Sequence, residues 1–249
     1  MVDHSQMKLG KAPARHDART LALADYVRRL APAPRECNRL AKVTDLRMHL
    51  NDQLGDCTCA TAAHIVHTWT GEDGAQVIVP DEAVLAMYEA VGGYRPGHPE
   101  TDNGAVELDV LRYWQKHPLA GHELLAYATL RPRQTEEVRQ AIHYFGAAYI
   151  GVALPLTAQS QDVWVVSGLH GDGEPGSWGG HAVPVVAYDK HFVTCITWGQ
   201  LKRMSWNFFY AYCDEAYCCL GPDLVGPDGR SPEGFDLPQL LADLALIRH

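Results

Sequence analysis

The sequence has no long run of uncharged apolar residues. A helix that spans a membrane needs about 18 or more such residues in succession, and none of the 249 residues belongs to a run of that length. The opening stretch, MVDHSQMKLGKAPARHDAR, also lacks the apolar core of an export signal. We therefore expect a soluble, cytoplasmic protein with no membrane partner.

An excess of positive charge is also missing. Lysines and arginines number 21 against 30 aspartates and glutamates, which gives a formal net charge of −9. Such a chain has no basic field that would attract a phosphate backbone. Nucleic acid is therefore not expected among its partners.

Low-complexity tracts and internal repeats are absent, whereas hydrophobic residues make up 47% of the chain. This length and composition suffice for one domain or for a domain with two lobes. The seven cysteines are an odd number and include two tight clusters, at 57 and 59 and at 213, 218 and 219. Reduced thiols fit this pattern better than a disulfide framework, which again indicates the cytoplasm.

Helix patterns precede strand patterns along the chain. Apolar residues at helical spacing or capping signals mark 17–30, 57–69, 80–94, 104–117 and 134–146. Three β-branched apolar runs, AAYIGVALPL, HAVPVVAYD and HFVTCITW, then indicate buried strands. The tail ends in a short apolar stretch, LPQLLADLALI, which we expect to form a helix on the body.

The stretch NDQLGDCTCATAA, residues 51–63, places two cysteines at the expected start of a helix. A thiol in the first turn lies near the positive end of the helix dipole, which favours the nucleophilic thiolate. An apolar stripe runs along this helix through Ala62, Ile65, Val66 and Trp69. Cys59 falls on that stripe and Cys57 on the opposite side, so Cys57 is the preferred nucleophile and Cys59 a core residue.

A histidine suited to act as a base occurs in GSWGGHAVPVVAYD, residues 176–189. His181 follows two glycines and opens an apolar strand, so the backbone holds it rigidly and small neighbours let a substrate approach. In thiol enzymes the nucleophile and its base usually lie far apart in the sequence. Cys57 and His181 are a candidate pair of this kind.

The order of these motifs resembles that of the papain-like cysteine peptidases. That family has a glutamine six residues before the nucleophilic cysteine, a histidine in a GHAV-type strand, and an asparagine within NSWG. The corresponding pieces here are NDQLGDCTCA, GGHAVPVVAYD and ITWG, and the likeness extends over residues 33–215. Bacterial members with LGSCTA around the nucleophile resemble this chain more closely than papain does, which supports Cys57.

The resemblance implies an α+β, papain-like two-lobed fold with a cleft between a helical lobe and a β-barrel-like lobe. The implied organisation is an N-terminal extension (1–32), a catalytic domain (33–219) with a helical lobe at about 51–145 and a β-rich lobe at about 146–219, and a C-terminal loop and helix packed on the body (220–249). We expect the extension to pack on the surface, with an inhibitory position over the cleft as the alternative.

The sequence departs from the family pattern at two positions. The six-residue spacing pairs Asn51 with Cys57 or Gln53 with Cys59, so either amide is a candidate donor to the oxyanion, beside the Cys57 N–H. Where the family has asparagine two residues before tryptophan, this chain has Ile196, which cannot accept a hydrogen bond from the histidine. Thr197 is the nearest substitute for that orienting group.

The implied function is that of a thiol-dependent peptidase or amide hydrolase, a Cys-His acyl-transfer enzyme acting on a peptide or protein substrate. Trp178, Gly180 and Trp198 would line the substrate site. No cofactor is expected, and the oligomeric state is not predicted. The alternative is a catalytically inactive papain-like scaffold that serves as a binding or structural protein, which the loss of the asparagine favours.

Metal and phosphate sites are competing interpretations. CTC followed by His64 and His67 offers four ligands, but zinc sites space their cysteines by two to four residues, and one helix rarely turns four ligands to a single point. No metal site is therefore expected. GDGEPGSWGG lacks the Lys-Ser/Thr pair of a phosphate loop.

Overall fold

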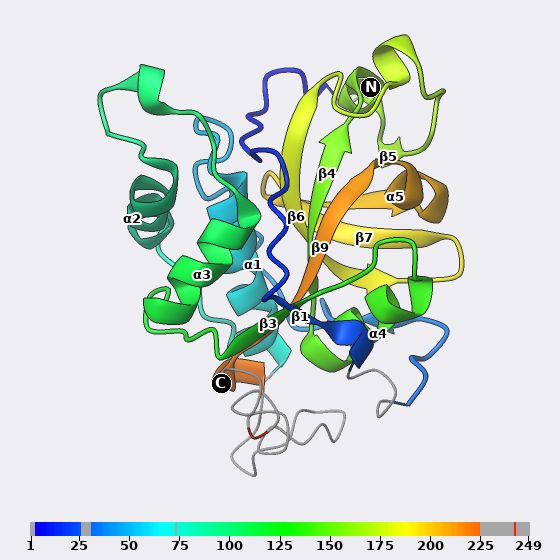
Figure 1. Ribbon diagram of the computed structural model, residues 1–249, viewed down its shortest axis with the longest axis horizontal. Coiled ribbons are helices and arrows are strands. Elements are labelled where there is room, and N and C mark those ends of the chain that lie inside the picture. Colours follow the sequence, from blue (N-terminus) through cyan, green and yellow to red (C-terminus); the bar gives the residue numbers. More distant parts are fainter. Residues whose placement is uncertain (1–2, 26–30, 73, 225–241, 243–249) are drawn as a thin grey trace.

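The computed structural model describes residues 3–25, 31–72, 74–224 and 242 (Figure 1). The helices are α1 (Cys57–Glu72), α2 (Asp81–Gly92), α3 (Glu107–Lys116), α4 (Thr135–Phe145) and α5 (Trp206–Tyr212). The strands are β1 (Leu21–Ala22), β2 (Cys37–Asn38), β3 (Ala126–Thr129), β4 (Ala148–Leu154), β5 (Val163–Trp164), β6 (Gly179–Tyr188), β7 (Phe192–Thr197), β8 (Gln200–Ser205) and β9 (Cys213–Leu220). Helices thus precede most strands, as the sequence predicts.

All nine described strands join one sheet in the order β1-β3-β9-β4-β6-β7-β8-β5, with β2 paired to β6. The β1–β3 and β5–β8 pairs are parallel, and the others are antiparallel. In Figure 1, α1, α2 and α3 lie to one side of this sheet. The expected β-barrel-like lobe is thus an open mixed sheet, and the helices form the other lobe.

The three apolar runs form neighbouring strands at the centre of the sheet. They are β4, β6 and β7, and the first two pair antiparallel from Ala148 opposite Val185 to Leu154 opposite Gly179. Six of the seven β4 residues are buried. Burial on both faces explains the near-continuous apolar sequence.

Helix α1 is buried along almost its whole length, from Cys57 to Gly71. The sequence predicts a single apolar stripe, but β4, β6 and β7 pack on one side of this helix and α2 and α3 on others. Thr61, Thr68 and Thr70 tolerate burial because their hydroxyls bond to carbonyls one turn earlier. Thr61, for example, donates to the Cys57 carbonyl at 2.8 Å.

Helix α4 lies in the sequence range expected for the helical lobe but packs against β4, β6 and β9. Its Arg139 guanidinium lies 5.5 Å from the ring centres of both Tyr188 and Trp206. The boundary between the lobes in space therefore does not follow the sequence order.

The expectation of a helix over 17–30 is wrong for the part of it that the structure describes. Residues 21–22 form β1 beside β3, and Leu23–Asp25 form a 3-10 turn. Asp17 accepts from the N–H and the guanidinium of Arg19 rather than capping a helix. Residues 26–30 lie outside the described residues, as does the expected C-terminal helix except for residue 242.

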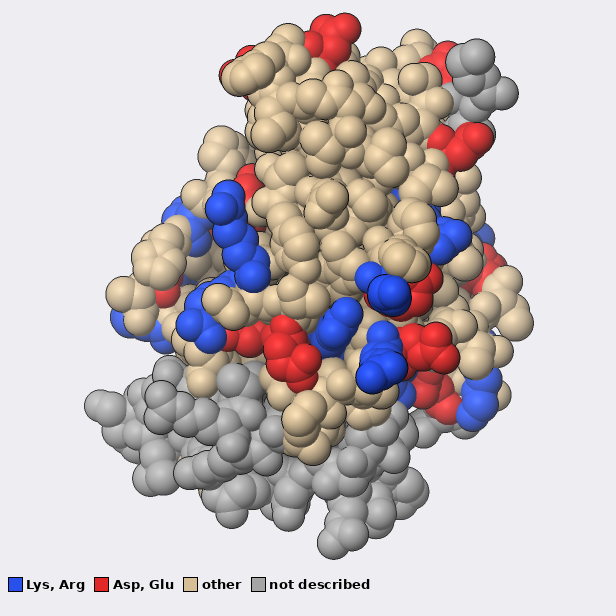
Figure 2. Space-filling view, turned by 90° about the vertical axis from the view of Figure 1, so that its right-hand side faces the viewer, with Lys and Arg blue, Asp and Glu red and all other residues tan. Residues whose placement is uncertain are grey.

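Lysines and arginines intermingle with acidic residues on the face that Figure 2 shows, mostly in its lower half. Large apolar side chains are exposed at Leu156, Val165, Val166, Leu169 and Leu201 among others. In the described part of the chain, no helix combines the length and the apolar character needed to cross a bilayer.

Candidate active site

Cys57 is the first residue of α1, where the sequence places a nucleophile. Its side chain is only 1% exposed. Burial raises the pKa of the thiol to about 12, and the backbone of Ala182 and of Gly10 offsets only part of that rise. The thiol is therefore protonated in this state, although its surroundings contain donors that would stabilise a thiolate.

His181 lies near the start of β6 and is fully buried. Its Nε2 is 2.7 Å from the Thr197 hydroxyl, and its Nδ1 has no hydrogen-bond partner among the described residues. The ring stacks on Trp198, with the ring centres 4.6 Å apart and the planes at 18°. Burial lowers the pKa of His181 to about 3, so the imidazole is neutral here.

The hydrogen bond to His181 depends on the alternation of side chains along β7. Thr197 ends the strand and directs its hydroxyl to the imidazole, whereas Ile196, its neighbour, is buried in the core with 1% exposure. The next residue, Trp198, has a positive φ of 47°, which starts the turn into β8. The position at which the papain-like family has asparagine is therefore a buried core position in this chain, occupied by Ile196.

Helix α1, which begins with Cys57, packs on β6, the strand that carries His181. The backbone of Ala182, the residue directly after the histidine, partly opposes the rise in the pKa of the Cys57 thiol. No described hydrogen bond joins the sulfur to the imidazole in this state. The free Nδ1 of His181 is the nitrogen left to receive a proton.

The two candidate amides differ in their surroundings. Asn51 is buried and its Nδ2 donates to the carbonyl of Leu54 at 3.0 Å, whereas Gln53 is exposed. Cys59, the alternative nucleophile, is fully buried in the core, as predicted, and burial raises its pKa well above the ordinary value.

A leading segment, residues 8–12, lies across this site. The N–H of Lys11 donates to the Gly180 carbonyl at 3.0 Å, and the Gly10 carbonyl accepts from Ala105 at 2.8 Å. The indole of Trp198 donates to the carbonyl of Lys8 at 3.3 Å. Figure 1 shows this part of the chain passing between α3 and β6. This part of the extension is therefore held by backbone hydrogen bonds to Ala105 on one side and Gly180 on the other.

Glycines make room for the leading segment. A Cβ on Gly10 would lie 1.7 Å from the Gly55 carbonyl oxygen, and one on Gly104 would lie 2.0 Å from the Gly10 carbonyl oxygen. On the sheet side, a Cβ on Gly180 would lie 2.3 Å from the carbonyl oxygen of Lys11. Real Cβ atoms do not approach so closely, so the backbones touch only because these residues have no side chains.

A buried hydrogen-bond network fixes two of those glycines. Asp102 accepts from the Gly55 N–H at 2.9 Å and from the Tyr88 hydroxyl at 2.6 Å. The same hydroxyl accepts from the N–H of Gly104 at 2.9 Å. Asp102 therefore links the loop before Cys57 to the loop before α3.

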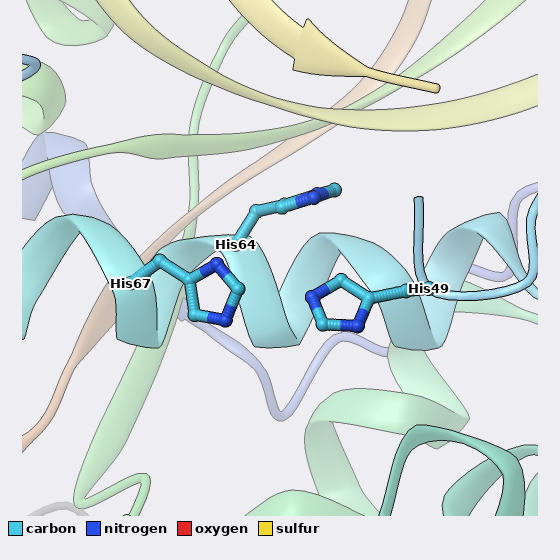
Figure 3. A group of neighbouring side chains, drawn as sticks. All are labelled: His49, His64 and His67. Atoms are coloured by element: carbon cyan, nitrogen blue, oxygen red, sulfur yellow. The ribbon is translucent and has the colours of Figure 1, made fainter. Parts of the chain in front are cut away.

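Three buried histidines form a separate cluster under α1, and Figure 3 shows their rings facing a common space. They are His64 and His67 of α1 and His49 of the preceding loop, and their candidate ligand atoms all lie within 4.8 Å of one another. The sequence pattern did not single out His49, because it lies in an irregular stretch with no ligand spacing. Of the four ligands considered in the sequence, His64 and His67 belong to this cluster, and Cys57 and Cys59 do not.

Hydrogen bonds decide which nitrogens of the cluster could hold a metal. His49 Nδ1 bonds to Asp81 at 3.1 Å and His64 Nε2 to the Leu46 carbonyl at 2.8 Å, which leaves a lone pair on the other nitrogen of each ring. His67 Nε2 accepts from the N–H of Val79 at 3.0 Å, so its Nδ1 carries the proton. The cluster offers two ligands as it stands, and a third only if His67 gives up that bond.

Comparisons of this chain with known proteins give matches among solved structures. No protein-family model and no curated protein matches the sequence. Xylellain, a cysteine protease from Xylella fastidiosa, is 14% identical over 88% of this chain and 98% of its own, with a TM-score of 0.63. The cysteine protease and lectin-like domains of Cwp84 from Clostridium difficile (13%, TM-score 0.61) match 88% of this chain and 57% of theirs. Procathepsin B S9 from Trypanosoma congolense (13%, TM-score 0.58) matches 86% and 87%.

The chain therefore has the papain-like cysteine protease fold, which confirms the class predicted from the motif order. At these identities the likeness concerns the fold. The functional argument rests on the residues that the fold brings together.

Proposed function

We propose that the protein is a thiol-dependent peptidase or amide hydrolase in which Cys57 is the nucleophile and His181 the base. One observation carries the proposal. The Nε2 of His181 lies 2.7 Å from the Thr197 hydroxyl, and the Nδ1 of the same buried ring has no hydrogen-bond partner among the described residues. A neutral imidazole held in this tautomer can take the thiol proton on Nδ1.

The reaction would proceed by acyl transfer. His181 takes the proton of Cys57, and the thiolate attacks the carbonyl carbon of the scissile amide. The Cys57 N–H and the side-chain amide of Asn51 or Gln53 donate to the oxyanion. His181 then protonates the leaving amine, and a water that gives its proton to His181 hydrolyses the thioester. Trp178, Gly180 and Trp198 would line the substrate site.

In the described state this enzyme would be latent. The backbone of Gly10 lies against Gly55, two residues before Cys57, and burial keeps both reacting groups uncharged. Displacement of the leading segment admits water and substrate, which removes the desolvation that opposes the thiolate and imidazolium pair. Activity should therefore rise when the segment is weakened.

The inactive scaffold remains the second candidate, because Ile196 replaces the usual orienting asparagine with a core residue. Under that proposal the fold binds a partner and the Cys57 thiol has no special reactivity. The cytoplasmic location and the absence of nucleic-acid and membrane partners are proposals from composition.

The test uses the full chain with Gly10→Ala, since a Cβ there collides with the Gly55 carbonyl and must displace the segment. Hydrolysis of a fluorescent casein digest is measured with this variant, with Cys57→Ser added, and with Cys59→Ser added as the matched control. We expect hydrolysis in the first and third proteins and none in the second. Hydrolysis that survives Cys57→Ser, or that none of the proteins shows, contradicts the proposal.

A further inference from the structure

Lys11 of the leading segment is buried in an acidic pocket. Its side chain is 1% exposed, and its Nζ lies 3.0 Å from Asp214 Oδ2 and 2.9 Å from Glu215 Oε1. Lysine is seldom fully buried unless its charge is paired. Burial alone would lower the pKa of Lys11, but Glu107, Glu215 and Asp214 together raise it above its ordinary value. The lysine is therefore held as a cation.

The pocket fits the lysine stem because of one glycine in the centre of β4. A Cβ on Gly151 would lie 2.0 Å from the Lys11 Cε and 2.8 Å from both Glu107 Oε1 and Asp214 Oδ1. Any other residue at this buried strand position would fill the space. The fold thus leaves a hole of side-chain width whose end is lined by carboxyl groups.

The acidic groups outnumber the cation that they surround. Glu107, the first residue of α3, is fully buried, and neither of its carboxyl oxygens has a hydrogen-bond partner among the described residues. Burial raises the pKa of Glu107 well above its ordinary value, and the charge of Glu215 adds to that rise, while Lys11 opposes it. A buried carboxyl without partners gains by any cation that enters.

The pocket opens beside the nucleophile. A Cβ on Gly10, the residue before Lys11, would lie 1.7 Å from the carbonyl oxygen of Gly55, two residues before Cys57. The N–H of Lys11 itself donates to the carbonyl of Gly180, next to His181. A peptide that follows the same track along Ala105 and Gly180 would direct one side chain into the pocket. The leading segment shows which side chain fits there.

We propose that the pocket formed by Glu107, Asp214, Glu215 and Gly151 is the specificity site for a lysine side chain of the substrate, which Lys11 occupies until it is displaced. The inference rests on the proposed peptidase function for its biological meaning. The binding preference itself does not require catalysis. Arginine, with a planar and wider head, should fit less well beside the Gly151 backbone.

The test uses the full chain with Lys11→Met, which removes the charge of Lys11 from the pocket. The matched control is Lys116→Met, since Lys116 is an exposed lysine at the end of α3. The probe is the peptide KLGKAPA, which copies residues 8–14, and its analogue with norleucine in place of the second lysine. Calorimetry gives the two affinities. We expect Lys11→Met to bind the lysine peptide at least about tenfold more tightly than the norleucine peptide, and Lys116→Met to bind neither.

Two further variants test which carboxyl groups cause the preference for the lysine peptide. Glu107→Gln and Glu215→Gln, each added to Lys11→Met, should remove most of the tenfold difference while the norleucine affinity stays unchanged. Equal affinities for both peptides in Lys11→Met overturn the proposal. If Lys11→Met fails to fold, Gly10→Ala serves as the second background, since it keeps the lysine but displaces the segment. If the protein prefers the lysine peptide but never cleaves a peptide, the pocket is supported and the peptidase function is refuted. If it cleaves peptides without that preference, the peptidase function is supported and the pocket is refuted.

Discussion

The hydroxyl of Thr197 lies 2.7 Å from Nε2 of His181, and Ile196, the residue before it, is buried in the core. The Thr197 hydroxyl can rotate so that it accepts a hydrogen bond from the Nε2–H of His181. The proton of the neutral ring then lies on Nε2, and Nδ1 keeps a free lone pair that points away from Thr197. Trp198 stacks on the same ring and keeps water from this bond. Under the proposed function, we expect Thr197 to orient the imidazole of His181.

Thr197→Val tests this relationship with a side chain of the same shape. Loss of the acceptor leaves a buried imidazole N–H unpaired at a cost of about 1–3 kcal/mol. We expect the rate of hydrolysis in the Gly10→Ala background to fall by about tenfold or more. Thr194→Val, in the same strand and without a bond to His181, should leave the rate within about twofold. Equal rates for both variants would show that Thr197 does not orient the base.

Two alanine substitutions distinguish the roles of the amide side chains before α1, those of Asn51 and Gln53. Asn51→Ala removes the hydrogen bond to the Leu54 carbonyl and should lower the free energy of unfolding by about 1 kcal/mol. Gln53→Ala, at an exposed site, should leave it unchanged. The variant that also lowers the kcat of hydrolysis by about a hundredfold identifies the oxyanion donor. If neither variant lowers kcat, the oxyanion relies on the Cys57 N–H alone.

The histidine cluster makes the fold sensitive to acid. Burial, with the neighbouring imidazoles as a second cause, lowers the pKa of His49 to about 2. In the unfolded chain its pKa is near the ordinary 6.5. Below that pH the unfolded state binds a proton that the folded state excludes. Stability is therefore complete above about pH 7 and falls as the pH drops, by about 1.4 kcal/mol per pH unit for each such histidine.

His49→Asn tests that contribution. Asparagine tolerates the positive φ of 52° at this position and retains a donor for Asp81, but it does not titrate. We expect urea unfolding between pH 6 and 5 to show a pH slope shallower by about 1.4 kcal/mol per unit than in the unaltered chain. His16→Asn, at an exposed site, is the control and should keep the full slope. An unchanged slope in His49→Asn would mean that His49 takes up its proton in the folded state.

Tyr88→Phe tests the network that joins the loops beside the nucleophile. The substitution removes the donor to Asp102 and the acceptor for the Gly104 N–H, both inside the protein. We expect the free energy of unfolding to fall by about 1–3 kcal/mol. Amide exchange at Gly55 and Gly104 should accelerate more than exchange in β4. Tyr113→Phe, on a less buried face of α3, provides the comparison. A uniform acceleration would indicate global destabilisation instead.

The order of the local motifs was enough to predict the fold. A thiol after a Gly-Asp turn marked the start of α1, and the β-branched runs marked β4, β6 and β7, because these signals arise from neighbouring residues. Cys57 and His181 were proposed as site residues from such local motifs, and Thr197 from the resemblance, and these assignments stay predictions. Their placement relative to one another needed the packing of α1 on β6.

The lysine pocket was beyond the reach of the sequence. Lys11 and Asp214 are 203 residues apart, and no spacing rule connects them. In the sequence, Gly151 is only a glycine within an apolar strand. Its role becomes visible in the structure, where Lys11 lies against it. His49 was missed for the same reason, since an isolated histidine in a loop carries no ligand spacing.

The most direct test of the central claim is the rate at which iodoacetamide labels Cys57, measured against pH by peptide mapping in full-length Gly10→Ala with and without His181→Ala. An activated pair predicts that Cys57 labels far faster than the other cysteines below pH 7, and that this advantage disappears without the histidine. Labelling of Cys57 that follows the pH profile of an ordinary thiol in both proteins would contradict the account and leave a papain-like scaffold that binds without catalysis.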